Sequence, residues 1–292
     1  MTRRRKKKII ARKIYRLVGT LRFAVGLLGL DEWFASSTRH IEVTRPVIEI
    51  ASLPAAWDSV RIALLSDIHY GPLVTLDRVR GIVALTNSLG ADLIVLAGDL
   101  VRRSTDADPR LSAALSALRA PLGVYAVLGN HDYWRGVGPT VRALAAAGIT
   151  LLYNSHRLLE RDGARLCLAG VDDVWQGEPD LDAALARVPD RTVRILLCHN
   201  PDYAEQLPPA PRVDLVLSGH AHGGQIKLPV ISRFFRSIRH RKYLAGLVRG
   251  PRCEVYVSRG LGVVGLPIRF RCPPELPLVT LRREAGSPRR TR

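Results

Sequence analysis

Apolar and polar residues alternate in blocks from about residue 58 onward, and the blocks predict strands and helices in turn. Short apolar runs bounded by polar or glycine-rich stretches indicate buried strands, and longer mixed runs with helical spacing lie between them. The predicted strands cover residues 60–65, 92–97 and 123–128, and the predicted helices cover residues 76–89, 109–118 and 140–147. This alternation is typical of βαβ units and predicts a largely parallel sheet.

More closely spaced strands follow residue 148 and predict a second sheet packed on the first. These strands cover residues 150–153, 157–160, 165–171, 193–198, 215–217, 254–257 and 278–281, and one helix covers 180–187. The chain is therefore expected to form an α/β fold. Its 292 residues and apolar content of 47% suffice for a buried core.

Side chains that can bind metals follow the predicted strands, at the point where each strand ends. Loops at the carboxyl ends of strands converge in open α/β sheets, so these side chains are expected to lie together. The candidate ligands are Asp67, His69, Asp99, Asn130, His199, His220 and His222. Gly219, Gly223 and Gly224 flank the last two and leave room for a ligand.

The donor types at these positions indicate a particular kind of metal centre. A mixture of carboxylate, imidazole and amide oxygen suits Mn²⁺, Fe or Zn²⁺, and it does not match an all-oxygen calcium site or a thiolate zinc site. An aspartate at a strand end can bridge two ions. Such a pair holds the attacking and leaving oxygens of a phosphoryl transfer and lowers the pKa of a bound water.

Five motifs in order carry a resemblance to a known family. They are D-x-H (67–69), GD (98–99), GNHD (129–132), a histidine at 199, and GH-x-H (219–222). The set resembles the calcineurin-like metallophosphoesterase superfamily over roughly residues 60–282. The resemblance implies a four-layer α/β/β/α sandwich of two mixed sheets, with a dinuclear centre at the carboxyl ends of the strands.

The resemblance also implies a role for each residue. Asp67, His69 and His222 would hold one metal ion, Asn130, His199 and His220 would hold the other, and Asp99 would bridge them. His131 would contact the phosphate or protonate the leaving oxygen. Manganese is the expected ion, with Fe, Zn²⁺ or Mg²⁺ as alternatives.

One motif departs from the family pattern. Many members read GD-x-x-D-R, whereas this chain reads GDLVRR over 98–103. Arg102 replaces the acidic residue, which puts the support of the GNHD histidine in doubt. Arg103 falls at the position of the family arginine and is the candidate for binding substrate phosphate.

Two longer stretches give a finer resemblance. SGHAHGGQIKLP (218–229) and YVSRGLGVVGLPIRF (256–270) are similar to a bacterial branch of membrane-linked phosphodiesterases. That branch is similar to enzymes that cleave UDP-2,3-diacylglucosamine in lipid A biosynthesis. The expected reaction is hydrolysis of a phosphodiester or pyrophosphate bond by a metal-activated hydroxide, on a lipid-linked or nucleotide-linked substrate.

The net charge of +18 is uneven and indicates attraction to polyanions. Residues 1–30 carry ten Lys or Arg and no acid, and their apolar positions follow one helical face. We expect a basic amphipathic segment that lies on the cytoplasmic face of the inner membrane. A spanning segment, a cleaved signal peptide and a periplasm-facing anchored form are the alternatives.

The remaining boundaries follow from charge and pattern. Residues 31–57 connect the N-terminal segment to a catalytic domain over 58–282, which carries a basic insert at 227–252 with eight Lys or Arg. Residues 283–292 form a basic tail. The four cysteines show no C-x-x-C spacing and are expected to be buried and reduced, with a Cys253–Cys272 bridge as the alternative.

Three other functions stay open at this point. A phosphomonoesterase or protein phosphatase would use the same dinuclear centre, and a nuclease would suit the basic charge. The third alternative is a membrane or nucleic-acid binding protein on a degenerate phosphoesterase fold. Retention of all seven candidate ligands weighs against that last alternative.

Overall fold

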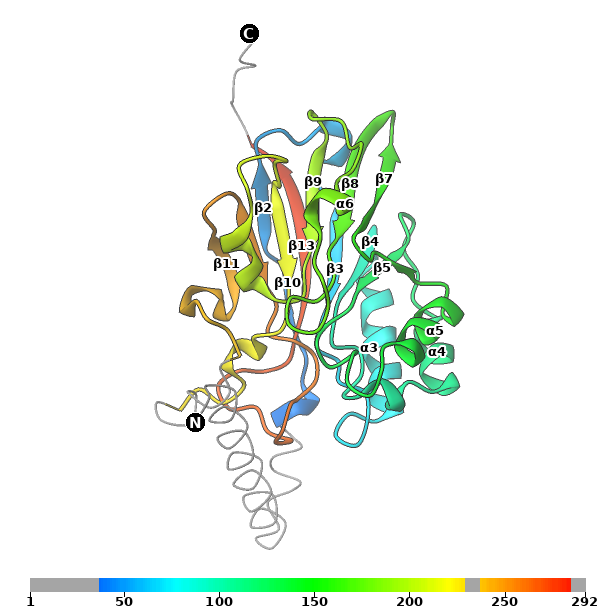
Figure 1. Cartoon of the computed structure of the whole chain (residues 1–292). Coiled ribbons are helices and arrows are strands. Elements are labelled where there is room, and N and C mark those ends of the chain that lie inside the picture. The colour runs from blue at the N-terminus through cyan, green and yellow to red at the C-terminus, as the bar shows by residue number, and fades with distance from the viewer. Residues whose placement is uncertain (1–36, 229–236, 285–292) are drawn as a thin grey trace, which may run out of the picture.

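The computed structural model describes residues 37–228 and 237–284 (Figure 1). Two mixed sheets pack against each other. The first contains β1 (Glu42–Thr44), β2 (Val47–Ile50), β3 (Arg61–Leu65), β4 (Leu93–Ala97), β5 (Val124–Val127), β6 (Thr150–Leu151) and β13 (Glu275–Arg283). The second contains β7 (Ser155–Arg161), β8 (Ala164–Gly170), β9 (Val193–Leu197), β10 (Leu215–Ser218), β11 (Gly246–Arg249) and β12 (Glu254–Val257).

Each sheet has a parallel centre. The first runs β1-β13-β3-β4-β5-β6, with β2 also paired to β13, and β3 to β6 are mutually parallel. The second runs β11-β12-β10-β9-β8-β7, and its two edge strands are antiparallel to their neighbours. The carboxyl ends of β3, β4 and β5 therefore share one edge of the first sheet.

Helices cover the outer faces unequally. On the first sheet lie α3 (Leu76–Ser88), α4 (Pro109–Leu115) and α5 (Gly138–Ala146), which Figure 1 shows grouped beside β4 and β5. On the second lie α6 (Leu181–Ala184) and the short 3₁₀ helices η3 (Pro201–Gln206) and η6 (Arg241–Leu244). Further 3₁₀ turns are η1 (Ala55–Trp57), η2 (Ser104–Asp106) and η4 (His222–Gly224).

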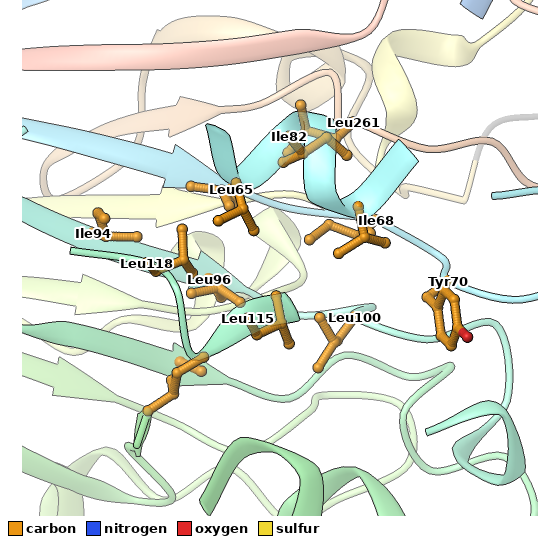
Figure 2. Packing of buried hydrophobic residues seen from close by; sticks show 14 of the residues in the cluster. Leu65, Ile68, Tyr70, Ile82, Ile94, Leu96, Leu100, Leu115, Leu118 and Leu261 are labelled. Carbon is orange, nitrogen blue, oxygen red and sulfur yellow. The ribbon is translucent and has the colours of Figure 1, made fainter. Parts of the chain in front are cut away.

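Alternation along the strands separates the buried residues into layers. In β3, Ala63 and Leu65 face the core between the first sheet and its helices, which we call the helical core. Ile62 and Leu64 face the opposite way, into the core between the two sheets. In Figure 2, Leu65 and Leu96 lie near side chains from α3 and the α4 region in the helical core. A third core fills the space between the second sheet and its 3₁₀ helices. Three cores between four layers match the expected α/β/β/α sandwich.

Most elements coincide with the sequence prediction. Local signals explain the helix starts, because Thr75 caps α3 and Asp108 caps α4 through their side-chain oxygens. The predicted helix 180–187 is shorter, since α6 ends at Ala184. Three strands were not predicted: β1 and β2 lie in the connecting segment 31–57 and pair with β13, and β11 lies in the basic insert.

Several predictions concern residues outside the described ranges. The N-terminal segment 1–30, residues 229–236 of the basic insert and residues 285–292 of the basic tail fall there. Within 37–228 and 237–284, no helix has both the length and the apolar character that crossing a bilayer requires. The four cysteines are buried and unpaired, as predicted, and no Cys253–Cys272 bridge forms.

Candidate metal centre

All seven predicted ligands are buried, and they lie just beyond the carboxyl ends of five strands. β3 positions two of them, β4 and β5 one each, β9 one and β10 two. Five have a left-handed backbone, with φ of 52°, 53°, 53°, 69° and 50° for Asp67, His69, Asp99, His220 and His222 respectively. Such conformations are uncommon for residues other than glycine and gather at functional sites.

One group of donors forms around the D-x-H motif. The Nε2 atoms of His69 and His222 are 3.0 Å apart, and His222 Nε2 is 3.3 Å from Asp67 Oδ1. The backbone N–H of His220 donates to both oxygens of Asp67. A β-carbon on Gly219 would lie 2.3 Å from Asp67 Oδ2, so glycine is required for this close approach.

A second group forms around His199. Its Nδ1 lies 2.7 Å from the carbonyl oxygen of Ala97, which can only accept, so Nδ1 carries the proton and Nε2 offers a lone pair. That Nε2 lies 3.3 Å from Asp99 Oδ2 and 3.1 Å from His220 Nδ1. His220 Nε2 is 3.3 Å from the carbonyl of Ser237, which leaves its Nδ1 lone pair directed into the centre.

Asp99 lies between the two groups. Its Oδ2 is 3.6 Å from His69 Nε2 and 3.3 Å from His199 Nε2, one nitrogen from each group. Its Oδ1 accepts the backbone N–H of His131 at 2.8 Å, which fixes the carboxylate plane. This position is the one that a bridging carboxylate requires.

A buried oxygen without a partner fits a cation. Asn130 Oδ1 is buried and has no hydrogen-bond partner among the described residues. Buried polar groups are nearly always satisfied, so an orphaned amide oxygen beside convergent imidazoles indicates a missing ligand. Lone pairs and a carboxylate facing one another at 3.0–3.6 Å also need a positive charge between them.

The pKa shifts lead to the same conclusion. Burial lowers the pKa of His69, His220 and His222, that of His220 to about 3, so these rings are neutral donors. Burial alone would also disfavour the His199 imidazolium, but the Asp99 carboxylate raises the pKa of His199 to about 10. The carboxylate thus favours positive charge at the Nε2 side of His199, which is the side where a bound cation would lie.

Comparison with known proteins agrees with this geometry. Residues 60–224 match the family model of the calcineurin-like phosphoesterases, which is more than half of the chain. The protein belongs to the calcineurin-like phosphoesterase family. It is a metallophosphoesterase, a hydrolase of phosphoric esters.

Similar proteins include named relatives in two bacteria. The chain is 35% identical over 248 residues to the uncharacterized metallophosphoesterase YkuE of Bacillus subtilis, covering 83% of this chain and 86% of that protein. It is 33% identical over 228 residues to the phosphodiesterase YaeI of Escherichia coli, covering 76% and 82%.

Other similar proteins are longer, and this chain covers a smaller share of them. A transmembrane protein with a metallophosphoesterase domain from Danio rerio is 34% identical over 80% of this chain, which spans only 56% of that protein. Among solved structures, a 5'-nucleotidase precursor from Thermus thermophilus is similar over 76% of this chain and 55% of the nucleotidase chain. The TM-score is 0.46 and the sequence identity is 15%.

Arg102 replaces the acidic residue that many family members have in this motif, and the structure shows what supports His131 instead. His131 Nδ1 lies 2.9 Å from the backbone carbonyl of Arg102, so the main chain orients the ring in place of the absent carboxylate. The ring of Trp134 packs on the other side, with its centroid 3.8 Å away. Arg103 is exposed directly before η2 and its backbone N–H donates to Asp106, so its role in phosphate binding stays a prediction.

A loop after β12 supports the centre and was not predicted from the sequence. Leu261 and Gly262 donate their backbone N–H groups to the carbonyls of Ser66 and Asp67. The buried guanidinium of Arg269 donates to the carbonyls of Gly260 and Gly262 and so holds this loop together. The only sequence signal was the motif YVSRGLGVVGLPIRF, which carried a resemblance but no assigned role.

Proposed function

We propose that this metallophosphoesterase hydrolyses a phosphodiester or pyrophosphate bond at a centre of two divalent metal ions. The observation that carries the proposal is the pair of buried donor groups that share Asp99. Asp67, His69 and His222 form one group, and Asp99, His199 and His220 form the other; in each, the ligand atoms lie within 4.8 Å of one another. The resemblance would add Asn130 to the second group, and its buried amide oxygen has no hydrogen-bond partner among the described residues.

The protein would contribute orientation and a proton to the reaction. When bound, two divalent ions neutralise the phosphate and activate a water molecule. His131 is held by its backbone bond to Asp99 and by its Nδ1 bond to Arg102, so its Nε2 can give a proton to the departing oxygen when the ring carries a second proton on that nitrogen. Asp99 lies close to one nitrogen of each donor group and would hold the two groups at a fixed distance from each other.

The substrate is proposed to be an amphiphilic anion. The net charge of +18 favours polyanions, and the sequence of residues 1–30 combines basic charge with apolar residues at helical spacing. Such a segment supports location at the cytoplasmic surface of the inner membrane. UDP-2,3-diacylglucosamine, with a pyrophosphate, a nucleotide and two acyl chains, is the specific candidate.

Hydrolysis of two matched substrates tests the proposal. The full chain loaded with Mn²⁺ would be assayed with bis-p-nitrophenyl phosphate and with p-nitrophenyl phosphate. We expect the diester to be cleaved with the higher kcat/KM, and UDP-2,3-diacylglucosamine in detergent to be cleaved faster still. A preference for the monoester would overturn the phosphodiesterase in favour of a phosphatase, and no cleavage of any of the three would overturn the proposal altogether.

A further inference from the structure

A pocket of about 600 Å³ lies next to the metal centre. Its walls include Val174, Trp175, Asn200, Gln206, Ser237 and Ile238. None of these residues belongs to the predicted metal ligands. The pocket is large enough for a planar group of several rings or for a sugar.

Contacts through His220 join this pocket to the centre. The Trp175 ring packs perpendicular to the His220 ring, with 4.4 Å between the centroids. Ser237 holds His220 through two further contacts: its hydroxyl donates to the His220 carbonyl at 2.8 Å, and its own carbonyl lies 3.3 Å from His220 Nε2. A substrate with its phosphorus at the centre would therefore place its next group against Trp175.

Trp175 is held firmly while its ring remains half exposed. The buried carboxylate of Asp173 accepts the backbone N–H groups of Trp175 and Gln176, at 3.0 and 2.8 Å. The side chain of Trp175 is nevertheless 51% exposed, whereas Trp57 is fully buried in the core. A fixed, exposed indole at the edge of a pocket is an aromatic surface available to a ligand.

The other walls favour a polar ligand over an acyl chain. The two acidic wall residues are already paired, Glu205 with Lys242 at 2.6 Å and Asp202 with His240 at 3.0 Å, and the exposed wall residue Arg239 adds a positive charge that suits an anionic group of the ligand. Gln206 adds an amide, and Asn200 Nδ2 has no hydrogen-bond partner in the described part of the chain. One aromatic face with amide groups beside it matches the faces and edges of a nucleobase.

We propose that Trp175 and this pocket bind the base of a nucleotide group whose phosphate occupies the metal centre. This inference rests on the proposed function and narrows it, because it selects nucleotide-linked substrates. The indole stacks on the base, and Asn200 and Gln206 face its polar edge. Trp175 is then a residue that determines specificity.

Calorimetric titration tests the inference without relying on turnover. AMP and ribose 5-phosphate would be titrated into Mn²⁺-loaded wild type and into the Trp175→Ala and Trp175→Phe variants. Stacking on a base contributes about 1–3 kcal/mol, so Trp175→Ala should weaken AMP binding about tenfold. Trp175→Phe should restore most of the affinity, and ribose 5-phosphate should bind all three proteins alike. Leu247→Ala, at an exposed apolar site on β11, is the matched control.

The outcomes separate this inference from the proposed function. Equal affinity of AMP for wild type and Trp175→Ala would overturn it, as would AMP binding no tighter than ribose 5-phosphate to wild type. A similar loss for both ligands would also overturn it, because Trp175 would then act only by positioning His220. Failure of the proposed function would appear separately, as preference for p-nitrophenyl phosphate or as absent hydrolysis of all three substrates.

Discussion

At the scale of single residues, the centre depends on which nitrogen of each histidine carries its proton. At three histidines a backbone carbonyl determines which nitrogen is protonated. These pairs of histidine and carbonyl are His199 with Ala97, His220 with Ser237, and His131 with Arg102. A carbonyl can only accept, so each ring turns its other nitrogen toward the site. Main-chain atoms thus perform a task that carboxylates often perform around metal centres.

Replacement of His131 tests its assigned role directly. His131→Ala should lower kcat for bis-p-nitrophenyl phosphate by about 10²–10⁴-fold, because the leaving oxygen loses its proton donor. Metal content should stay at the wild-type value, because the groups of Asp67, His69 and His222 and of Asp99, His199 and His220 keep their ligands, although His131 itself lies within reach of His69 and Asp99. His156→Ala removes a histidine that contacts Ala184 on another part of the chain and serves as the control. Wild-type turnover in His131→Ala would show that the assigned role is wrong.

At the scale of elements, the loop over residues 258–262 keeps the D-x-H strand end in place. Its backbone N–H groups donate to the carbonyls of Ser66 and Asp67. The Arg269 guanidinium stabilises the loop by donating to two of its carbonyls. A β-carbon on Gly262 would lie 2.1 Å from the Ile68 carbonyl oxygen. The ligands on β3 therefore depend on a segment almost two hundred residues away in the sequence.

A pair of glycine substitutions tests this dependence. Gly262→Ala should displace the segment carrying Asp67 and His69, weakening Mn²⁺ binding by about tenfold or more and costing about 1–3 kcal/mol of unfolding free energy. Gly81→Ala, on the exposed side of α3 with nothing within 4 Å, should stabilise the protein by about 0.5–1 kcal/mol and leave Mn²⁺ binding unchanged. Denaturant unfolding and Mn²⁺ titration measure both. Unaltered metal binding in Gly262→Ala would show that the loop does not position the ligands.

A structural feature of this molecule could be predicted from the sequence when the residues that determine it are close together along the chain. Strands such as β3 and β4 were predictable because their apolar runs are buried on both faces. Their polar ends located the candidate ligands. By contrast, β1 and β11 are short, half-buried edge strands, and only tertiary pairing distinguishes them from loops. The positions of Trp175 and Arg269 likewise follow from contacts with distant segments.

At the scale of the whole molecule, the centre and the basic segments have separate locations in the sequence. The metal ligands lie between residues 67 and 222, whereas ten of the 44 Lys and Arg residues lie in 1–30. Charge near a membrane acts within a Debye length of about 10 Å at 0.1 M salt. We propose that attraction to an anionic membrane surface comes from the N-terminal residues.

Flotation with vesicles tests that assignment. The full chain should float with vesicles rich in anionic lipid, and a chain of residues 31–292 should stay in solution, because it lacks ten basic residues and the apolar residues at helical spacing. Vesicles of zwitterionic lipid provide the control, and binding to them should be weaker. Equal flotation of the two chains would contradict the membrane assignment.

The central claim is that the two donor groups around Asp99 hold two metal ions. Mass-spectrometric metal analysis after reconstitution with Mn²⁺ and desalting tests it most directly. The account predicts two ions per wild-type chain, two in Asp77→Asn, which alters an exposed carboxylate on α3, and fewer than two in Asp99→Asn. One ion or none in the wild type, or two in Asp99→Asn, would contradict it.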